Sequence, residues 1–126
     1  METNMKKMGQ HFLIDSRVLK RIVEYSGAGK KDVILEIGAG TGNLTAALAA
    51  KAKKVYAIEL DYELAVNLER QFSGTNVAVI KGDALKLKFP EFNKAVANLP
   101  YYISSDLTFK LLQHRFELAV LMYQKE

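Results

Sequence analysis

The sequence predicts an α/β domain of the doubly wound class, in which helices cover both faces of a parallel β-sheet. Five short apolar runs, rich in valine and isoleucine, recur along the chain with helical stretches between most of them. These runs are continuously apolar rather than alternating, as strands buried on both faces are. A helical stretch also precedes the first run, which completes the element order typical of this class. The expected strands are Val33–Ile37, Val55–Glu59, Val77–Ile80, Ala95–Ala97 and Leu118–Tyr123.

Four segments have the composition or spacing of helices. The first has one apolar face; Asp15 or Ser16 can cap its start, and Gly27 can end it. The second is rich in alanine and leucine, which favour helix. The third and fourth repeat apolar residues on one side, as amphipathic helices do. These helices are expected at Arg17–Ser26, Thr41–Ala50, Tyr62–Phe72 and Ser105–Gln113.

The composition excludes several classes of protein. A chain of 126 residues, 49% of them apolar, fits one domain with its own core. No apolar run approaches the ~20 residues that span a bilayer, so no membrane partner is expected. There is no cysteine, and His11 and His114 are the only histidines, so we expect no metal site. The first residues lack the long apolar stretch of a secretory signal, and we expect a cytoplasmic protein.

The positive charge is concentrated at the front of the chain. Residues 1–31 hold seven lysines and arginines against three acidic residues, which accounts for the whole net charge of +4. Contact with phosphates is one interpretation, and a solvated helix face with a lysine-rich tail is the other. We therefore divide the chain into a basic segment with a helix that packs on the core, residues 1–31, and a partial α/β domain, residues 32–126.

The remaining charged groups and the last strand give four further expectations. Lys86, Lys88 and Lys94 are expected on a solvated surface, with contact to RNA as the alternative, and His114 at a solvent-facing helix end. The sequence stops directly after the apolar run LAVLMY, whose edge a protein normally covers. We therefore expect a front part of a longer protein, and self-association through the exposed edge of the fifth strand.

A glycine-rich loop, Glu36–Gly42, lies between the first expected strand and the second helix. Glycines allow a sharp turn and a close approach of a ligand to the backbone, and the following helix directs free N–H groups at that ligand. The spacing is G-x-G-x-G, so the dinucleotide pattern G-x-G-x-x-G is not matched. A P-loop is also unsupported, because no lysine with serine or threonine follows the last glycine.

Acidic residues end the next two strands. Glu59 lies 21 positions after Gly38, where a carboxylate that binds ribose hydroxyls is expected. Asp83 follows the third strand and can accept a hydrogen bond from an adenine amino group. Taken singly, the glycines could form a tight turn and each acid could cap a helix. In this order, they favour a nucleotide-like ligand at the carboxyl edge of the sheet.

The fourth strand leads into an unusual string, Asn98-Leu99-Pro100-Tyr101. The amide oxygen of Asn98 can accept a hydrogen bond from an exocyclic amine. Pro100 has no N–H and can fix a turn that presents a carbonyl as a second acceptor. Tyr101 offers a flat face on which a purine can stack. These groups describe a pocket for an aromatic amine such as adenine N6; the alternative is a buried asparagine with a turn proline and core tyrosines.

With these motifs the chain resembles the ribosomal RNA adenine dimethyltransferases. That family transfers methyl groups from S-adenosylmethionine to N6 of adjacent adenines near the 3′ end of small-subunit rRNA. The matching stretches occur in order along nearly the whole chain. They are Gly9–Leu13, Glu36–Gly42, Ile58–Asp61, Gly82–Ala84 and Asn98–Tyr101 followed by Ile103–Ser105.

The resemblance implies a Rossmann-like methyltransferase core, truncated after the fifth strand, with small-subunit rRNA or a pre-ribosomal particle as partner. It implies that Glu59 holds the ribose and Asp83 the adenine of S-adenosylmethionine. It also implies that Asn98 and the Pro100 carbonyl hold the target amine of an extruded base, on which Tyr101 stacks. The implied cofactor-binding residues are His11, Leu13, Gly38, Gly40, Glu59, Asp83 and Asn98, and the implied catalytic residues are Asn98, Pro100 and Tyr101.

Four alternatives remain open at the level of sequence. One is a related methylase of large-subunit rRNA, and another is an N6-adenine DNA methylase. The DNA enzymes favour two prolines where this chain has Leu99-Pro100, which argues against them. A non-catalytic RNA-binding assembly factor is disfavoured by the intact Glu59, Asp83 and Asn98, and a nicotinamide-dependent enzyme by the loop spacing.

Overall fold

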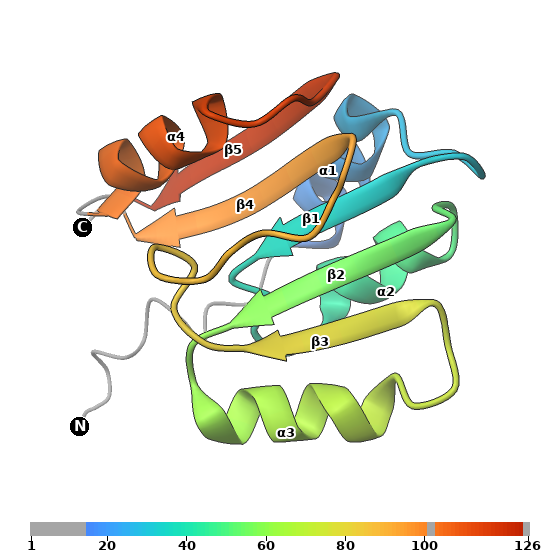
Figure 1. The fold of residues 1–126 in the computed structure, drawn as a ribbon. Coiled ribbons are helices and arrows are strands. Elements are labelled where there is room, and N and C mark those ends of the chain that lie inside the picture. The colour runs from blue at the N-terminus through green and yellow to red at the C-terminus, as the bar shows by residue number, and fades with distance from the viewer. Residues whose placement is uncertain (1–14, 101–102, 125–126) are drawn as a thin grey trace.

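The computed structural model describes residues 15–100 and 103–124 of the chain (Figure 1). Three of the expected site residues, His11, Leu13 and Tyr101, lie outside these described residues. The helices and strands are α1 (Ser16–Ser26), β1 (Val33–Ile37), α2 (Asn43–Ala49), β2 (Lys54–Glu59), α3 (Tyr62–Gln71), β3 (Val77–Lys81), β4 (Lys94–Pro100), α4 (Ser104–Leu112) and β5 (Leu118–Gln124).

The strands form a five-stranded sheet in the order β3-β2-β1-β4-β5, and each neighbouring pair is parallel. The chain runs from β1 outward through β2 to β3, then crosses back to place β4 on the other side of β1. The strand order therefore reverses between β1 and β4, which is where doubly wound sheets bind their ligands. All five arrowheads in Figure 1 point to the same edge, the carboxyl edge of the sheet. The predicted fold class is confirmed.

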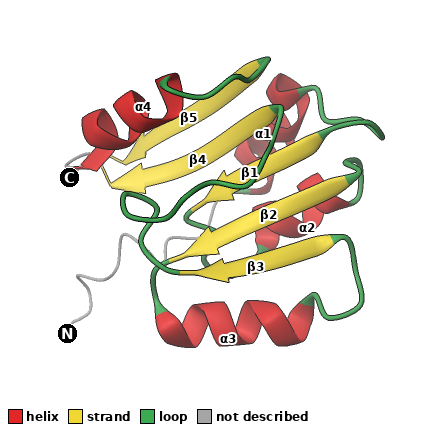
Figure 2. Cartoon of the chain, in the orientation of Figure 1, coloured by secondary structure: helices red, strands yellow, loops and turns green. Residues whose placement is uncertain are grey.

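Helices pack on both faces of the sheet (Figure 2). On one face, α1 and α2 bury Ile22 and Leu48 against β-strand residues such as Val55. On the other face, Leu107 and Leu111 of α4 pack with Leu35 of β1. A third cluster packs α3 on the same face as α1 and α2, because Leu68 and Phe72 contact Ala57 of β2 and Val77 packs against both clusters. Two-sided coverage explains why most consecutive strand positions are apolar, rather than every second one.

Local chemistry sets where the helices begin. Asp15 caps α1, since its Oδ1 accepts a hydrogen bond from Arg17 N at 2.8 Å, and Gly27 ends α1 in a left-handed conformation with φ 60°. Asp61, not Glu59, caps α3 by accepting from Leu64 N at 3.0 Å.

Two predicted boundaries were wrong. The second helix begins at Asn43 rather than Thr41, because Gly42 has φ 90° and cannot belong to a right-handed helix. The fourth strand is longer than expected and extends to Pro100, which pairs with Gln124 of β5 instead of starting a turn. Proline fits there because extended backbone suits its fixed φ and its missing N–H falls at the last position of the strand.

Two observations concern the exterior. None of the helices within the described part of the chain is long and apolar enough to cross a membrane. β5 is an edge strand, and Leu118 and Tyr123 on it are exposed. The division of the chain at residue 31 stays a prediction.

Candidate functional site

The expected site residues on β1 to β4 converge at the carboxyl edge of the sheet. Gly38 follows β1 and Glu59 ends β2, and these two strand ends are tied by the hydrogen bond from Gly38 N to Ile58 O, at 2.9 Å. The end of β3 joins them through Gly82 N, which donates to Glu59 O at 3.0 Å. Asp83 follows directly. The parallel register therefore gathers residues that lie up to 45 positions apart in sequence.

The glycine loop touches β4 at the point where the strand order reverses. Gly38 has φ 84°, and a Cβ placed on it would lie 2.7 Å from the backbone oxygen of Asn98. No carbon side chain tolerates that distance, so a glycine is required there on two grounds, conformation and space. Gly40 and Gly42 also have positive φ, of 60° and 90°. The loop is thus a stretch of bare backbone laid against the end of β4.

Glu59 connects the glycine loop to the start of α3. Its side chain is buried, 4% exposed, and Oε1 accepts from Gly40 N at 2.7 Å while Oε2 accepts from Asp61 N at 2.9 Å. A carboxylate has about four acceptor positions, so roughly two remain for a ligand. The Glu59 side chain therefore contacts the glycine loop, and it can still accept hydrogen bonds from hydroxyl groups.

A second carboxylate lies beneath the same loop. Glu36 of β1 is fully buried, and Thr45 Oγ1 of α2 donates to its Oε1 at 2.5 Å. Burial raises the pKa of Glu36 to about 7; the Thr45 hydrogen bond opposes this rise, and the negative charge of Glu59 adds to it. We assigned no role to Glu36 from the sequence. Its signal was a single acidic residue inside an otherwise apolar strand.

Asp83 lies in the connection between β3 and β4, which contains no helix. Its Oδ1 accepts from Leu85 N at 2.9 Å, so this residue shapes a local turn and does not cap a helix, which was the structural alternative. The connection is anchored from α4 by Lys110, whose Nζ donates to Ala84 O at 2.5 Å and also to Leu87 O. Burial lowers the pKa of Lys110, and the negative charge of Asp83 opposes that change.

Lys110 was not identified from the sequence. Besides its two carbonyl acceptors, its Nζ lies 4.3 Å from the centre of the Phe89 ring, a cation–π contact. α4 begins four residues after the end of β4, so Lys110 joins the connection that contains Asp83 to the helix that follows Asn98 and Pro100 in sequence. No sequence pattern predicts such a contact, because its partners lie 23 and 26 positions away.

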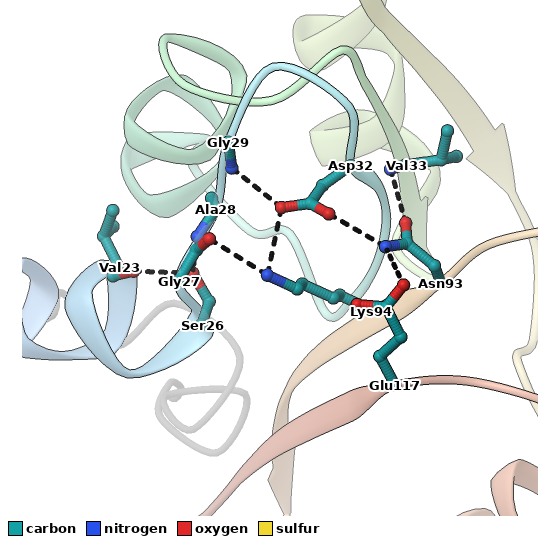
Figure 3. Close-up of polar contacts among 10 residues, drawn as sticks. All are labelled: Val23, Ser26, Gly27, Ala28, Gly29, Asp32, Val33, Asn93, Lys94 and Glu117. Carbon is teal, nitrogen blue, oxygen red and sulfur yellow. Dashed lines mark hydrogen bonds and ion pairs between the residues drawn. The ribbon is translucent and has the colours of Figure 1, made fainter.

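Two expectations about surface residues were wrong. Lys94 is not solvated: its Nζ lies 3.0 Å from Asp32 Oδ2, and both side chains are only 13% exposed. This ion pair lies at the amino end of β4, away from the site (Figure 3). His114 is half-buried, with its ring 5.1 Å from that of Phe89 and its Nδ1 3.0 Å from Lys110 O. Within residues 15–100 and 103–124, no three His, Asp or Glu side chains are grouped to hold a metal ion.

A parallel sheet with a glycine loop after β1, acids at the ends of β2 and β3, and Asn98 at the switch point defines a Rossmann-like methyltransferase core. A family model described as ribosomal RNA adenine dimethylase matches residues 1–126. The chain belongs to this family. Both the predicted fold and the resemblance found in the sequence are confirmed.

The relatives are similar across almost the whole chain. The probable ribosomal RNA small subunit methyltransferase A of Methanosarcina barkeri is 59% identical over 118 residues, which cover 93% of this chain and 41% of the relative. The protein of the same description from Thermococcus gammatolerans is 54% identical over 121 residues, covering 96% and 44%. The chain thus spans less than half the length of the curated relatives it matches.

Two solved structures have the same fold and substantial identity. A dimethyladenosine transferase from Plasmodium falciparum superposes with a TM-score of 0.84 at 42% identity, covering 91% of this chain and 44% of that one. The 23S rRNA methyltransferase ErmE superposes with a TM-score of 0.81 at 32% identity, covering 90% and 48%.

Proposed function

We propose that this chain carries the cofactor site of a small-subunit rRNA adenine N6-dimethyltransferase, which acts in ribosome maturation in the cytoplasm. The observation that carries the proposal is the contact between the two halves of the site. Gly38, in the loop assigned to the donor, lies against the carbonyl of Asn98, the residue assigned to the acceptor amine. Family membership and the identity to small-subunit methyltransferases support the same activity.

The residues present fit S-adenosylmethionine. The glycine loop offers backbone without side chains, and Glu59 retains acceptor capacity for two ribose hydroxyls. Asp83 Oδ2 can accept from an adenine amino group, since the turn bond from Leu85 N uses Oδ1. We assign Gly38, Gly40 and these two acids to cofactor binding, together with His11 and Leu13. When bound, the sulfonium supplies an electrophilic methyl group.

On this proposal the acceptor side works by positioning. Asn98 Oδ1 and the Pro100 carbonyl accept the two hydrogens of N6, so the nitrogen lone pair is directed toward the methyl carbon. Tyr101 stacks on the extruded base and holds its plane. The bound cofactor would supply its methyl group to N6 and keep the electron pair of its S–C bond. The methylated amine then releases one proton to solvent, and no general base is required.

Isothermal titration with S-adenosylmethionine tests cofactor binding by the 126-residue chain. We expect binding by the wild-type chain and strong weakening by Glu59→Gln, which preserves shape and removes the charge. A folded chain that takes up no S-adenosylmethionine would overturn the proposal. The same result would favour the non-catalytic assembly factor, which has no need of the cofactor.

A chimera tests methyl transfer, because the chain is shorter than its relatives. This chain replaces the matching 118 residues of the Methanosarcina barkeri relative, and the assay follows methyl transfer to small subunits that lack the modification. The relative itself is the positive control, and Asn98→Ala in the chimera is the negative one. Transfer that persists with Asn98→Ala would contradict the role given to that residue.

A second candidate is adenine methylation in large-subunit rRNA, favoured by the superposition with ErmE. The higher identity to small-subunit methyltransferases argues for the first candidate. Offering large subunits to the same chimera separates the two.

Self-association through β5 is a further part of this proposal, supported by the exposed Leu118 and Tyr123 on the edge strand. Sedimentation that finds only monomer at high concentration would dismiss it.

A further inference from the structure

The end of the sheet opposite the site is strongly basic. Lys30 and Lys31 lie in the turn before β1, Lys51 and Lys53 lie in the turn before β2, and all four side chains are exposed. We call them the amino-edge lysines. The two turns are neighbours, because Lys53 N donates to Asp32 O at 2.9 Å. Figure 1 shows both turns at the edge away from the arrowheads.

A buried side chain, Asp32, and a half-buried one, Asn76, hold the two turns in place. Asp32 closes the first turn twice, since its N donates to Gly29 O at 2.9 Å and its Oδ2 accepts from Gly29 N at 2.8 Å. Asn76 fixes the second turn by donating to Ala49 O at 2.9 Å and to Ala52 O at 3.0 Å. The amino-edge lysines therefore stand on fixed backbone, so binding through them orders side chains only.

No acidic group in the described part of the chain forms an ion pair with these lysines. The nearest carboxylate in sequence, Asp32, is directed inward: it accepts from Asn93 Nδ2 at 2.8 Å and pairs with Lys94 (Figure 3). Asn93 also bonds Val33 N at 2.7 Å, which anchors this cluster to β1. The positive charge at the edge is left for an external anion.

The purely structural alternative is that the lysines offset helix dipoles. That effect falls off beyond the last turn of a helix. Lys30 and Lys31 lie four and five residues past the end of α1, and Lys53 lies four past the end of α2. Only Lys51, two residues past α2, is within reach. The dipoles thus leave three of the four lysines unexplained.

We propose that the amino-edge lysines bind the sugar-phosphate backbone of a second segment of folded RNA, apart from the segment that supplies the target adenine. The choice of RNA rests on the proposed function. β1 and β2 hold five and six residues, so the two edges lie roughly 17–20 Å apart. One extruded nucleotide cannot reach both edges, whereas a large folded RNA presents further backbone there. Contact with phosphates alone makes this binding independent of base sequence.

The test measures binding of a labelled RNA hairpin to the full chain by fluorescence anisotropy, across a series of salt concentrations. The variant changes all four amino-edge lysines to glutamine. Each phosphate contact contributes about 0.7–0.9 to the slope of log affinity against log salt, so four contacts predict a slope smaller by about 3. Thermal unfolding of the variant checks that it remains folded.

A matched comparison separates this surface from net charge. Lys30→Gln/Lys31→Gln and Lys86→Gln/Lys88→Gln each remove two exposed lysines from one connection of the chain. We expect the first pair to lower the salt slope by about 1.5 and the second to change it little. Equal losses, or a wild-type chain that does not bind the hairpin, would overturn the proposal. So would loss of binding to phosphatidylserine vesicles with RNA binding intact, which would assign the surface to a membrane.

S-adenosylmethionine titration of the same four-lysine variant keeps the two proposals apart. We expect its cofactor affinity to equal that of the wild type, because the amino-edge lysines lie across the sheet from Glu59. Loss of hairpin binding with cofactor binding retained supports the surface. A wild-type chain that binds the hairpin through these lysines but does not bind S-adenosylmethionine would contradict the proposed function and leave the RNA-binding surface supported.

Discussion

Replacement of Gly38 by alanine tests the contact on which the site depends. The substitution forces a side chain into a left-handed conformation, φ 84°, at a cost of about 1–2 kcal/mol. It also places Cβ 2.7 Å from Asn98 O. That oxygen belongs to the backbone of a central strand and cannot rotate away. Such overpacking typically costs about 1–3 kcal/mol more.

The expected loss of unfolding free energy for Gly38→Ala is therefore about 2–5 kcal/mol, a large part of the ~5–15 kcal/mol typical of a domain. Urea denaturation followed by circular dichroism measures it. Because the loop and β4 must separate, S-adenosylmethionine binding should fall as well, under conditions where the variant is still folded.

Gly74→Ala is the matched control. Gly74 has φ 78°, close to that of Gly38, and no atom lies within 4 Å of a Cβ added there. This variant should lose only the conformational part, about 1–2 kcal/mol, and should keep its cofactor affinity. If Gly38→Ala proved no less stable than Gly74→Ala, the close packing of the loop against β4 would be refuted.

Three further predictions concern buried charges. The pKa of Glu36 is raised from 4.5 to about 7 in the folded chain, so the folded state holds the proton more tightly than the unfolded state. Stability should therefore decline as pH rises from about 4.5 to 7, by up to roughly 3 kcal/mol, and Glu36→Gln should flatten this slope in urea titrations at several pH values. Lys110→Met leaves the carbonyls of Ala84 and Leu87 unpaired and should cost about 1–3 kcal/mol. Lys110→Met should also weaken S-adenosylmethionine binding more than Lys110→Arg does. Equal affinities of the two variants for S-adenosylmethionine would contradict the idea that Lys110 holds the turn at Asp83. Lys94→Met leaves the carboxylate of Asp32 without its ion-pair partner and should lower the free energy of unfolding by roughly 3 kcal/mol. Adding Asp32→Asn should recover part of that loss. A double variant less stable than Lys94→Met would count against the ion pair.

The strands could be predicted from the sequence because the fold buries both faces of the sheet. Each strand of this sheet is mostly apolar on both faces, and the structure has a strand at all five predicted positions. The predicted start of the second helix at Thr41 and the predicted end of the fourth strand at Ala97 were wrong for local reasons. A left-handed Gly42 delays α2, and an extended proline prolongs β4.

The site residues also fall into those that the sequence predicts and those that it does not. Gly38, Glu59, Asp83 and Asn98 could be found because each lies at a strand end, and parallel strands bring their ends together. Glu36, Lys94 and Lys110 could not, since their partners lie 9 to 67 positions away and come close only through packing. The roles of all the expected site residues, with His11, Leu13 and Tyr101 among them, stay predictions.

The two amides that hold the Glu59 carboxylate have a consequence for how a ligand is received. The acid that would meet the ribose is confined to one rotamer before any ligand arrives, so little side-chain entropy is lost on association. Hydroxyl groups add to the existing bonds without displacing them. The same carboxylate joins the Gly40 amide to Asp61, which caps α3. A ligand bound to Glu59 would therefore stiffen the glycine loop and the connection between β2 and α3 together.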